Sequence, residues 1–282
     1  MAAALGLSVG AGCDHALVDA ERDREDLEQT LEQFATELRA HPGTLAHHRV
    51  DDVIRAWDVF DAAGRDLYAL MMAGQENAAF ATSLIDWRGT GRAAFVGAAD
   101  MAVQALVAAL GSLIDVSRRV MSKEPADLKV EYDRRVAAVV MQEPGAGFLK
   151  GLRNYLLHYG HAPWRVDGRF GPNDAAVTVT LVGEDLLMWD GWNVATRALI
   201  QREGNVNLGP LVSDYRNALR DLYVWLVGAI QNVHTEEIAA ANEVVRRRNL
   251  FLSDGAFETQ EAFMEVVTRG ITEWRAAHPK AP

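Results

Sequence analysis

Apolar residues spaced three or four positions apart recur along most of this 282-residue chain, and this spacing constrains the fold more than any other feature. Leu27, Leu31, Phe34 and Leu38 form one such stripe within a charged segment that covers residues 16–40. Side chains at this spacing share one face of an α-helix, because the helix turns about 100° per residue. The pattern therefore predicts a mainly α protein whose helices each bury one apolar face.

Further helices are predicted by the same reasoning, with breaks where Pro and Gly interrupt the pattern. They cover residues 44–73, 93–120, 125–142, 148–158, 191–202, 208–232 and 258–277, and residues 75–90 give a weaker signal. His41-Pro42-Gly43 ends the first helix, and Pro144-Gly145-Ala146-Gly147 is expected to break the chain. Arg246-Arg247-Arg248 either continues a helix or starts a loop.

Residues 177–181 have a period of two instead, because Val and Leu alternate with Thr. Gly183-Glu184-Asp185 is expected to turn the chain, and the residues after it to return as a second strand, giving a β-hairpin at about residues 175–190. An isolated hairpin is only marginally stable, so Trp189 or Trp192 is expected to anchor it on the helices. The predicted fold is an antiparallel helical bundle with one inserted β-hairpin.

The breaks divide the chain into three expected parts. Residues 1–43 form an N-terminal helical extension, residues 44–250 the helical bundle with its hairpin, and residues 251–282 a C-terminal helix and tail.

Composition excludes several classes of protein. Apolar residues make up 49% of the chain and charged residues 24%, which is typical of a folded protein and not of a disordered one. The 28 Lys and Arg against 39 Asp and Glu give a net charge of −11, which disfavours non-specific binding to DNA or anionic lipid. The one cysteine, Cys13, excludes an internal disulfide and Cys-built zinc or iron–sulfur sites. We therefore expect a reducing, cytoplasmic location. No cofactor is predicted.

No membrane partner is expected either. The apolar run Met1–Gly12 lacks the basic start of an export signal and leads directly into Asp14. The longest apolar stretch, Met101–Ile114, has 14 residues, whereas a spanning helix needs about 20. This stretch is therefore predicted to be a core helix.

The histidines do not form a recognisable metal-binding pattern. His47 and His48 are adjacent, so on a helix they point about 100° apart and would not chelate one ion together. A site assembled from His47, His158, His161 or His234 on separate helices stays open, but no spacing supports it, and no metal is predicted.

One segment combines residues suited to phosphate chemistry. Arg153, Asn154 and His158 fall within six residues of the predicted helix 148–158. Asn154 and His158 are one turn and about 40° apart, and Arg153 lies about 100° back from Asn154, so the three span one side of the helix. The residues on the other side are expected to face the core; they are Phe148, Leu149, Leu152 and Leu156, with Tyr155 as a further candidate.

The same region is a basic island on an acidic protein. Between Pro144 and Phe170 there are four cationic side chains and one carboxylate, a local charge of +3; these are Lys150, Arg153, Arg165, Arg169 and Asp167. Such an island suits a phosphate-bearing ligand, while the acidic background limits indiscriminate binding.

The segment Arg153-Asn154-Tyr155-Leu156-Leu157-His158 resembles the signature of the HEPN superfamily, a group of α-helical bundle proteins. The resemblance implies metal-independent RNA cleavage of the toxin or defence type, by homodimers that bring two motif helices to one cleft, with an antitoxin as a further partner. It implies that His158 acts as a general base or acid at the ribose 2′-hydroxyl. Arg153 would hold the scissile phosphate, and Asn154 would orient either His158 or the phosphate by hydrogen bonding. Further contacts to RNA are expected from Lys150, Tyr155, Tyr159, His161 and Arg165.

Alternatives stay open at this point. The chain could be an inactive HEPN-like module that binds a nucleotide or a protein, with Arg153 paired to an acidic residue and His158 bonded to a buried carbonyl. The tryptophans Trp164, Trp189 and Trp192 could stack bases beside the motif, but anchoring the hairpin is the preferred interpretation.

Overall fold

The computed structural model describes residues 27–85, 89–138, 140–170, 175–252 and 260–277. The expectations for Cys13, for Met1–Gly12 and for a helix at 16–26 lie outside these residues.

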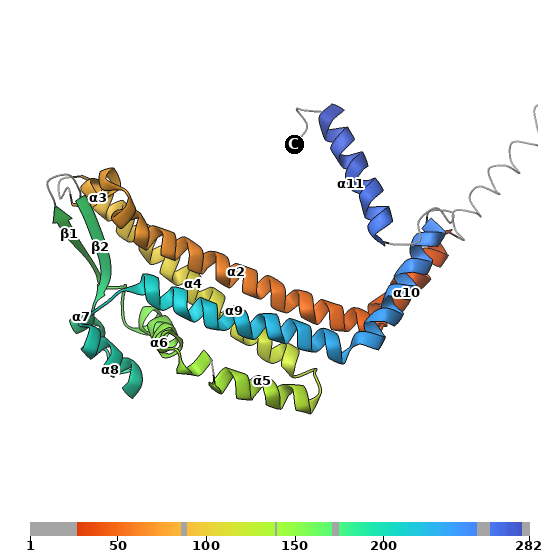
Figure 1. Ribbon diagram of the computed structural model, residues 1–282, viewed down its shortest axis with the longest axis horizontal. Helices are drawn as coiled ribbons and strands as arrows, with labels where there is room; N and C mark the ends of the chain where they lie inside the picture. Colours follow the sequence, from red (N-terminus) through yellow and green to blue (C-terminus); the bar gives the residue numbers. More distant parts are fainter. Residues whose placement is uncertain (1–26, 86–88, 139, 171–174, 253–259, 278–282) are drawn as a thin grey trace, which may run out of the picture. The chain divides into compact units, whose positions relative to one another are not determined.

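The described residues are mainly helical with one small antiparallel sheet, as predicted (Figure 1). Residues 27–40 are helical and are followed by α2 (Pro42–Glu76), α3 (Ala78–Ile85), α4 (Gly91–Met121), α5 (Ala126–Ala138), the 3₁₀ turn η1 (Val140–Gln142), α6 (Pro144–His158), α7 (Gly183–Leu187), α8 (Val194–Glu203), α9 (Leu208–Val233), α10 (Thr235–Leu252) and α11 (Gln260–Ala277). The strands are β1 (Trp164–Phe170), β2 (Ala175–Val182) and β3 (Asn205–Val206).

The chain forms two compact units. One, here called the bundle unit, comprises residues 49–232, and the other comprises residues 1–48 and 233–282. This division differs from the expected boundary at 250, because α10 packs with residues 27–40. The rings of Phe34 and Phe251 have centroids 5.9 Å apart, and Arg247 pairs with Glu37 at 2.7 Å.

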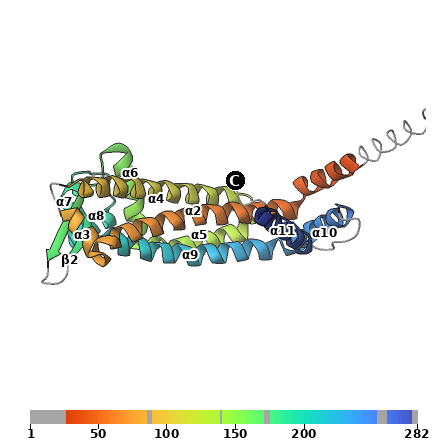
Figure 2. The same cartoon turned by 90° about the horizontal axis from the view of Figure 1, so that it is seen from above.

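Three long helices, α2, α4 and α9, run side by side through the bundle unit in both views (Figures 1 and 2). Each buries an apolar stripe, as the helical spacing predicts. Fully or almost fully buried members include Val53, Phe60 and Leu67 of α2, Val103, Leu106, Leu110 and Leu113 of α4, and Leu219, Leu226 and Ile230 of α9. Of the described helices, α4 is long and apolar enough to cross a membrane by length and composition; its buried stripe is also that of a core helix.

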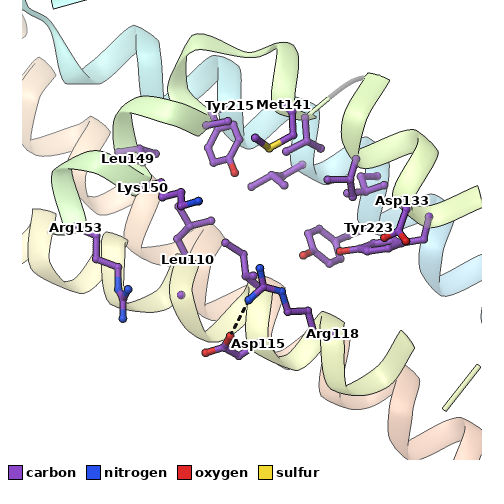
Figure 3. Close-up of a pocket in the computed structure, with 18 residues that line it drawn as sticks. Leu110, Asp115, Arg118, Asp133, Met141, Leu149, Lys150, Arg153, Tyr215 and Tyr223 are labelled. Atoms are coloured by element: carbon purple, nitrogen blue, oxygen red, sulfur yellow. Dashed lines mark ion pairs between the residues drawn. The ribbon is translucent and has the colours of Figure 1, made fainter. Parts of the chain in front are cut away.

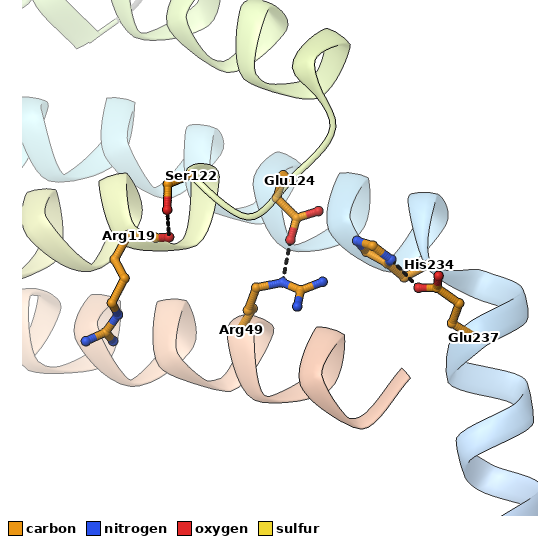
Figure 4. A network of polar contacts seen from close by, with 6 residues as sticks. All are labelled: Arg49, Arg119, Ser122, Glu124, His234 and Glu237. Carbon is orange, nitrogen blue, oxygen red and sulfur yellow. Dashed lines mark hydrogen bonds and ion pairs between the residues drawn. The ribbon is translucent and has the colours of Figure 1, made fainter. Parts of the chain in front are cut away.

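Ion pairs reinforce the packing of α2 within the bundle unit. The Arg49 guanidinium donates to the Glu124 carboxylate over 2.6 Å, and the Glu124 side chain has no exposed surface (Figure 4). Arg216 of α9 pairs with Asp61 of α2, also at 2.6 Å. Because such pairs are directional, they fix the position of one helix along the axis of its neighbour. The apolar contacts alone would do this less strictly.

The hairpin exists, but its strands differ from the predicted ones. β1 pairs antiparallel with β2 from Trp164↔Leu181 to Phe170↔Ala175, so the partner strand precedes β2 in the chain instead of following it. Residues 183–187, expected to turn and return, form the short helix α7, and the far side of β2 pairs with β3. The alternation in β2 is confirmed in part: Val177, Val179 and Leu181 are buried and Thr178 is exposed, but Thr180 is buried as well.

The predicted break at Pro144–Gly147 is also wrong, because these residues are the first turn of α6. Pro is well suited to that position, where the missing N–H would have no helical partner. Gly145 allows α6 to lie close to α9: a Cβ there would be 2.8 Å from Cβ of Tyr215 and 3.0 Å from the Leu211 carbonyl oxygen. The interruption falls earlier, where α5 ends at Ala138 and η1 follows.

Candidate functional site

Helix α6 carries the predicted motif and is held by its apolar face. Phe148, Leu149, Leu152 and Tyr155 are buried, as expected, whereas Leu156 is only half-buried. The packing fixes the rotation of α6, so the residues between these positions must face away from the core. The charged members of the motif lie on those remaining faces.

The Arg153 side chain is exposed and lines the edge of a cavity of about 390 Å³ (Figure 3). Lys150, one turn earlier, lines the same cavity. Among the described residues, none forms an ion pair or a side-chain hydrogen bond with Arg153. The alternative in which Arg153 is paired with an acidic residue of a neighbouring helix is therefore not what the described residues show.

His158 lies in the last turn of α6 and is exposed. It borders a separate hollow of about 340 Å³, together with Gln104, Tyr159 and His161. Within the described part of the chain, no buried carbonyl accepts a hydrogen bond from the His158 side chain.

The three motif residues do not converge on one hollow within a single chain. Arg153 and His158 are five residues apart, so they point about 140° apart around the helix axis. They line different hollows, and Asn154, which is half-buried, lines neither. A site that uses both Arg153 and His158 therefore needs a ligand that reaches around α6 or a second copy of α6.

The other predicted contact residues are divided among different environments. Tyr155 is buried, and its ring packs on those of Tyr159, Trp189 and Trp192; burial raises the pKa of its hydroxyl. Tyr159 is 48% exposed. Arg165 lies on β1 and pairs with Asp167 at 2.8 Å.

Two tryptophans of the motif region anchor the structure. The Trp192 indole N–H donates to the Leu186 carbonyl oxygen over 2.6 Å, and its ring stacks on Phe148 at 5.5 Å between centroids. The Trp164 indole donates to Asp100 of α4 over 2.7 Å and thereby ties β1 to the bundle. These contacts agree with the anchoring interpretation and leave the Trp192 ring buried, where it has no free face for a base.

Metal ligation has no support in this region. Among residues 27–85, 89–138, 140–170, 175–252 and 260–277, no group of three His, Cys, Asp or Glu side chains is placed to hold an ion.

The cavity beside Arg153 was not predicted from the sequence. Its lining comes from α4, α5, η1, α6 and α9, and includes Gly111, Tyr132, Tyr215 and Tyr223. The sequence feature that relates to the cavity is a tyrosine in the apolar stripe of 208–232, where Tyr215 stands between Leu211 and Leu219 at a spacing of four. That pattern alone is typical of core packing, so it does not reveal an open space.

Comparison with known proteins found no relative of this chain. No protein-family model, curated protein or solved structure matches the chain significantly.

Proposed function

We propose that this chain is a cytoplasmic, metal-independent endoribonuclease of the toxin or defence type, which acts as a homodimer with Arg153, Asn154 and His158 at its site. The observation that carries the proposal concerns Arg153 and His158. Arg153 and His158 lie on one helix, both exposed, and without side-chain partners among the described residues. An unpaired guanidinium and an unpaired imidazole are available for a phosphodiester.

The separation of Arg153 and His158 is the reason for invoking a dimer. One α6 cannot direct both side chains into a single hollow, whereas two copies of α6 could direct the Arg153 of one and the His158 of the other toward one phosphate. The end of α6 also exposes apolar surface beside the histidine, because Leu157 is 62% exposed and Tyr159 is 48% exposed. Burial of such side chains against a second copy would favour association.

The chemistry would follow from the ordinary properties of the groups. The His158 imidazole would accept the proton of the ribose 2′-hydroxyl, a role that histidine often has in general base catalysis. The 2′-oxygen would then bond to phosphorus while the bond to the 5′-oxygen breaks, and the leaving oxygen would take a proton from solvent or from a second imidazolium. Arg153 would stabilise the negative charge on the phosphate oxygens.

Substitution of His158 tests this proposal. His158→Ala should reduce RNA cleavage in the presence of EDTA by about 100-fold or more, which is typical for loss of a general base. The melting temperature should hardly change, because the side chain is exposed. His48→Ala removes an exposed histidine from α2 and should retain full cleavage. If the His158 variant cleaves as fast as the wild type, the assignment is wrong.

One observation favours a second candidate, a nucleotide-binding module without catalysis. The cavity beside Arg153 and Lys150 could take a small phosphate-bearing ligand, whereas His158 lies at a different hollow. In that case wild-type protein would bind a nucleotide, Arg153→Ala would weaken binding, and neither protein would cut RNA. An antitoxin or another protein partner would be compatible with both candidates.

A further inference from the structure

The cavity beside Arg153 is open to solvent at one side, and apolar side chains make up most of its lining. The apolar residues that line it include Leu110, Ile114, Val136, Leu149, Leu219 and Leu222. The volume of about 390 Å³ is within the range of small-molecule sites. An apolar body would therefore be transferred from water into this space favourably.

The charges around the cavity are unevenly distributed. Lys150 points into the cavity from α6, and Arg153 stands at its edge (Figure 3). Asp115 and Arg118 of α4 also line the cavity, but they face each other as an ion pair at 3.7 Å. The remaining carboxylate, Asp133 of α5, lies on the side opposite Lys150 (Figure 3). The α6 side of the cavity is therefore cationic.

The hydroxyl of a largely buried tyrosine also points into this space. Tyr215 is 4% exposed, and burial raises the pKa of its hydroxyl, so this group remains a hydrogen-bond donor at neutral pH. Figure 3 shows the Tyr215 oxygen directed into the cavity, and within the described residues no side chain or carbonyl forms a hydrogen bond with it. The neighbouring Tyr223 differs, because its hydroxyl bonds to that of Ser117 at 2.8 Å. The Tyr215 oxygen is itself open to the cavity, so a ligand acceptor placed there would receive its hydrogen bond.

The mouth of the cavity contains a glycine in the middle of a helix. Gly111 of α4 lowers helix stability relative to alanine, and an added Cβ would meet nothing closer than Nε of Arg153 at 3.5 Å. Close packing therefore does not require glycine at this position. Its absent side chain leaves the space beneath Arg153 open.

We propose that this cavity binds a small amphipathic anion, with its apolar body among the leucines and its carboxylate or phosphate held by Lys150, Arg153 and the Tyr215 hydroxyl. The three groups supply two cations and one neutral donor, which complement an anionic headgroup. The site does not depend on RNA cleavage, and its binding is measured without RNA.

Isothermal titration of the full chain tests the proposal with four ligands that share one tail: decanoate, decyl phosphate, decanol and decyltrimethylammonium. Decanoate or decyl phosphate should bind with a stoichiometry of one per chain, and the neutral and cationic ligands should bind about tenfold or more weakly, because charged hydrogen bonds would be lost. Tyr215→Phe should weaken binding of the better anion about fivefold, the usual effect of one hydrogen bond.

A pair of glycine variants locates the site. Gly111→Leu should abolish binding because its side chain fills the mouth, and leucine favours the helix, so the variant should fold. Gly97→Leu on the same helix, where no atom lies within 4 Å of an added Cβ, should bind as the wild type does. Equal affinity for all four ligands, binding unaffected by Gly111→Leu, or no binding of either anion would overturn the proposal.

Discussion

Substitution of Gly151 by alanine tests the packing of the motif helix. A Cβ at this position of α6 would lie 2.5 Å from both Cε3 and Cζ3 of Trp192, much closer than real contacts allow. The indole cannot easily retreat, because it is 5% exposed, stacks on Phe148 and donates to the Leu186 carbonyl oxygen. Overpacking of about 3 kcal/mol, offset by about 1 kcal/mol of gained helix propensity, should lower the free energy of unfolding by about 2 kcal/mol.

This change should lower the melting temperature by about 4–8 °C for a unit of this size. Urea denaturation followed by far-ultraviolet circular dichroism measures the free energy, and an unchanged slope would show that the denatured state is unaffected. Gly111→Ala is the matched control, because its Cβ would make only an ordinary contact, 3.5 Å from Nε of Arg153; it should instead stabilise by about 1 kcal/mol. If Gly151→Ala were as stabilising as Gly111→Ala, the described contact between α6 and Trp192 would be refuted.

Other parts of the structure give further measurable effects. Glu124→Leu removes the buried carboxylate opposite Arg49 and should lower the free energy of unfolding in urea by about 3–5 kcal/mol. Adding Arg49→Met to the same chain should recover part of that loss, and no recovery would argue against the pair. Asp100→Ala should cost about 1–3 kcal/mol, since the Trp164 indole loses its acceptor, and a neutral result would contradict that bond. Burial raises the pKa of Tyr215 above its ordinary value of 10.0. The folded chain therefore keeps a proton on Tyr215 that the unfolded chain loses. The free energy of unfolding should consequently fall as the pH rises above about 10. In an alkaline absorbance titration this tyrosine should ionise late, and ionisation at its ordinary pKa would contradict the burial.

The helices could be predicted from the sequence because each buries one stripe of regular spacing. The predicted helices 44–73, 93–120 and 208–232 correspond to α2, α4 and α9 with small changes at their ends. The hairpin could be predicted only in part. The apolar alternation of β2 was visible, but β1 includes charged Arg165 and Asp167 and contains a glycine, so its strand character depends on pairing with β2.

The first turn of α6 and the cavity depended on tertiary packing. Pro and Gly at 144–147 are typical of a break, but α9 lies so close to Gly145 that glycine is required within the helix. The sequence could place Arg153 and His158 on one exposed side of a helix. It could not show that they line different hollows, because the walls of those hollows come from α4 and α9 and from the chain after α6.

The most direct test of the central claim is the chemistry of the cut ends, measured with wild-type protein and a single-stranded RNA in EDTA, beside the same RNA carrying 2′-O-methyl groups. An exposed imidazole that activates the 2′-hydroxyl predicts fragments ending in a 2′,3′-cyclic phosphate and no cleavage of the methylated strand. Cleavage of the methylated strand, or failure to cut any unmodified RNA in a varied set, would contradict a function in which Arg153 and His158 act on RNA.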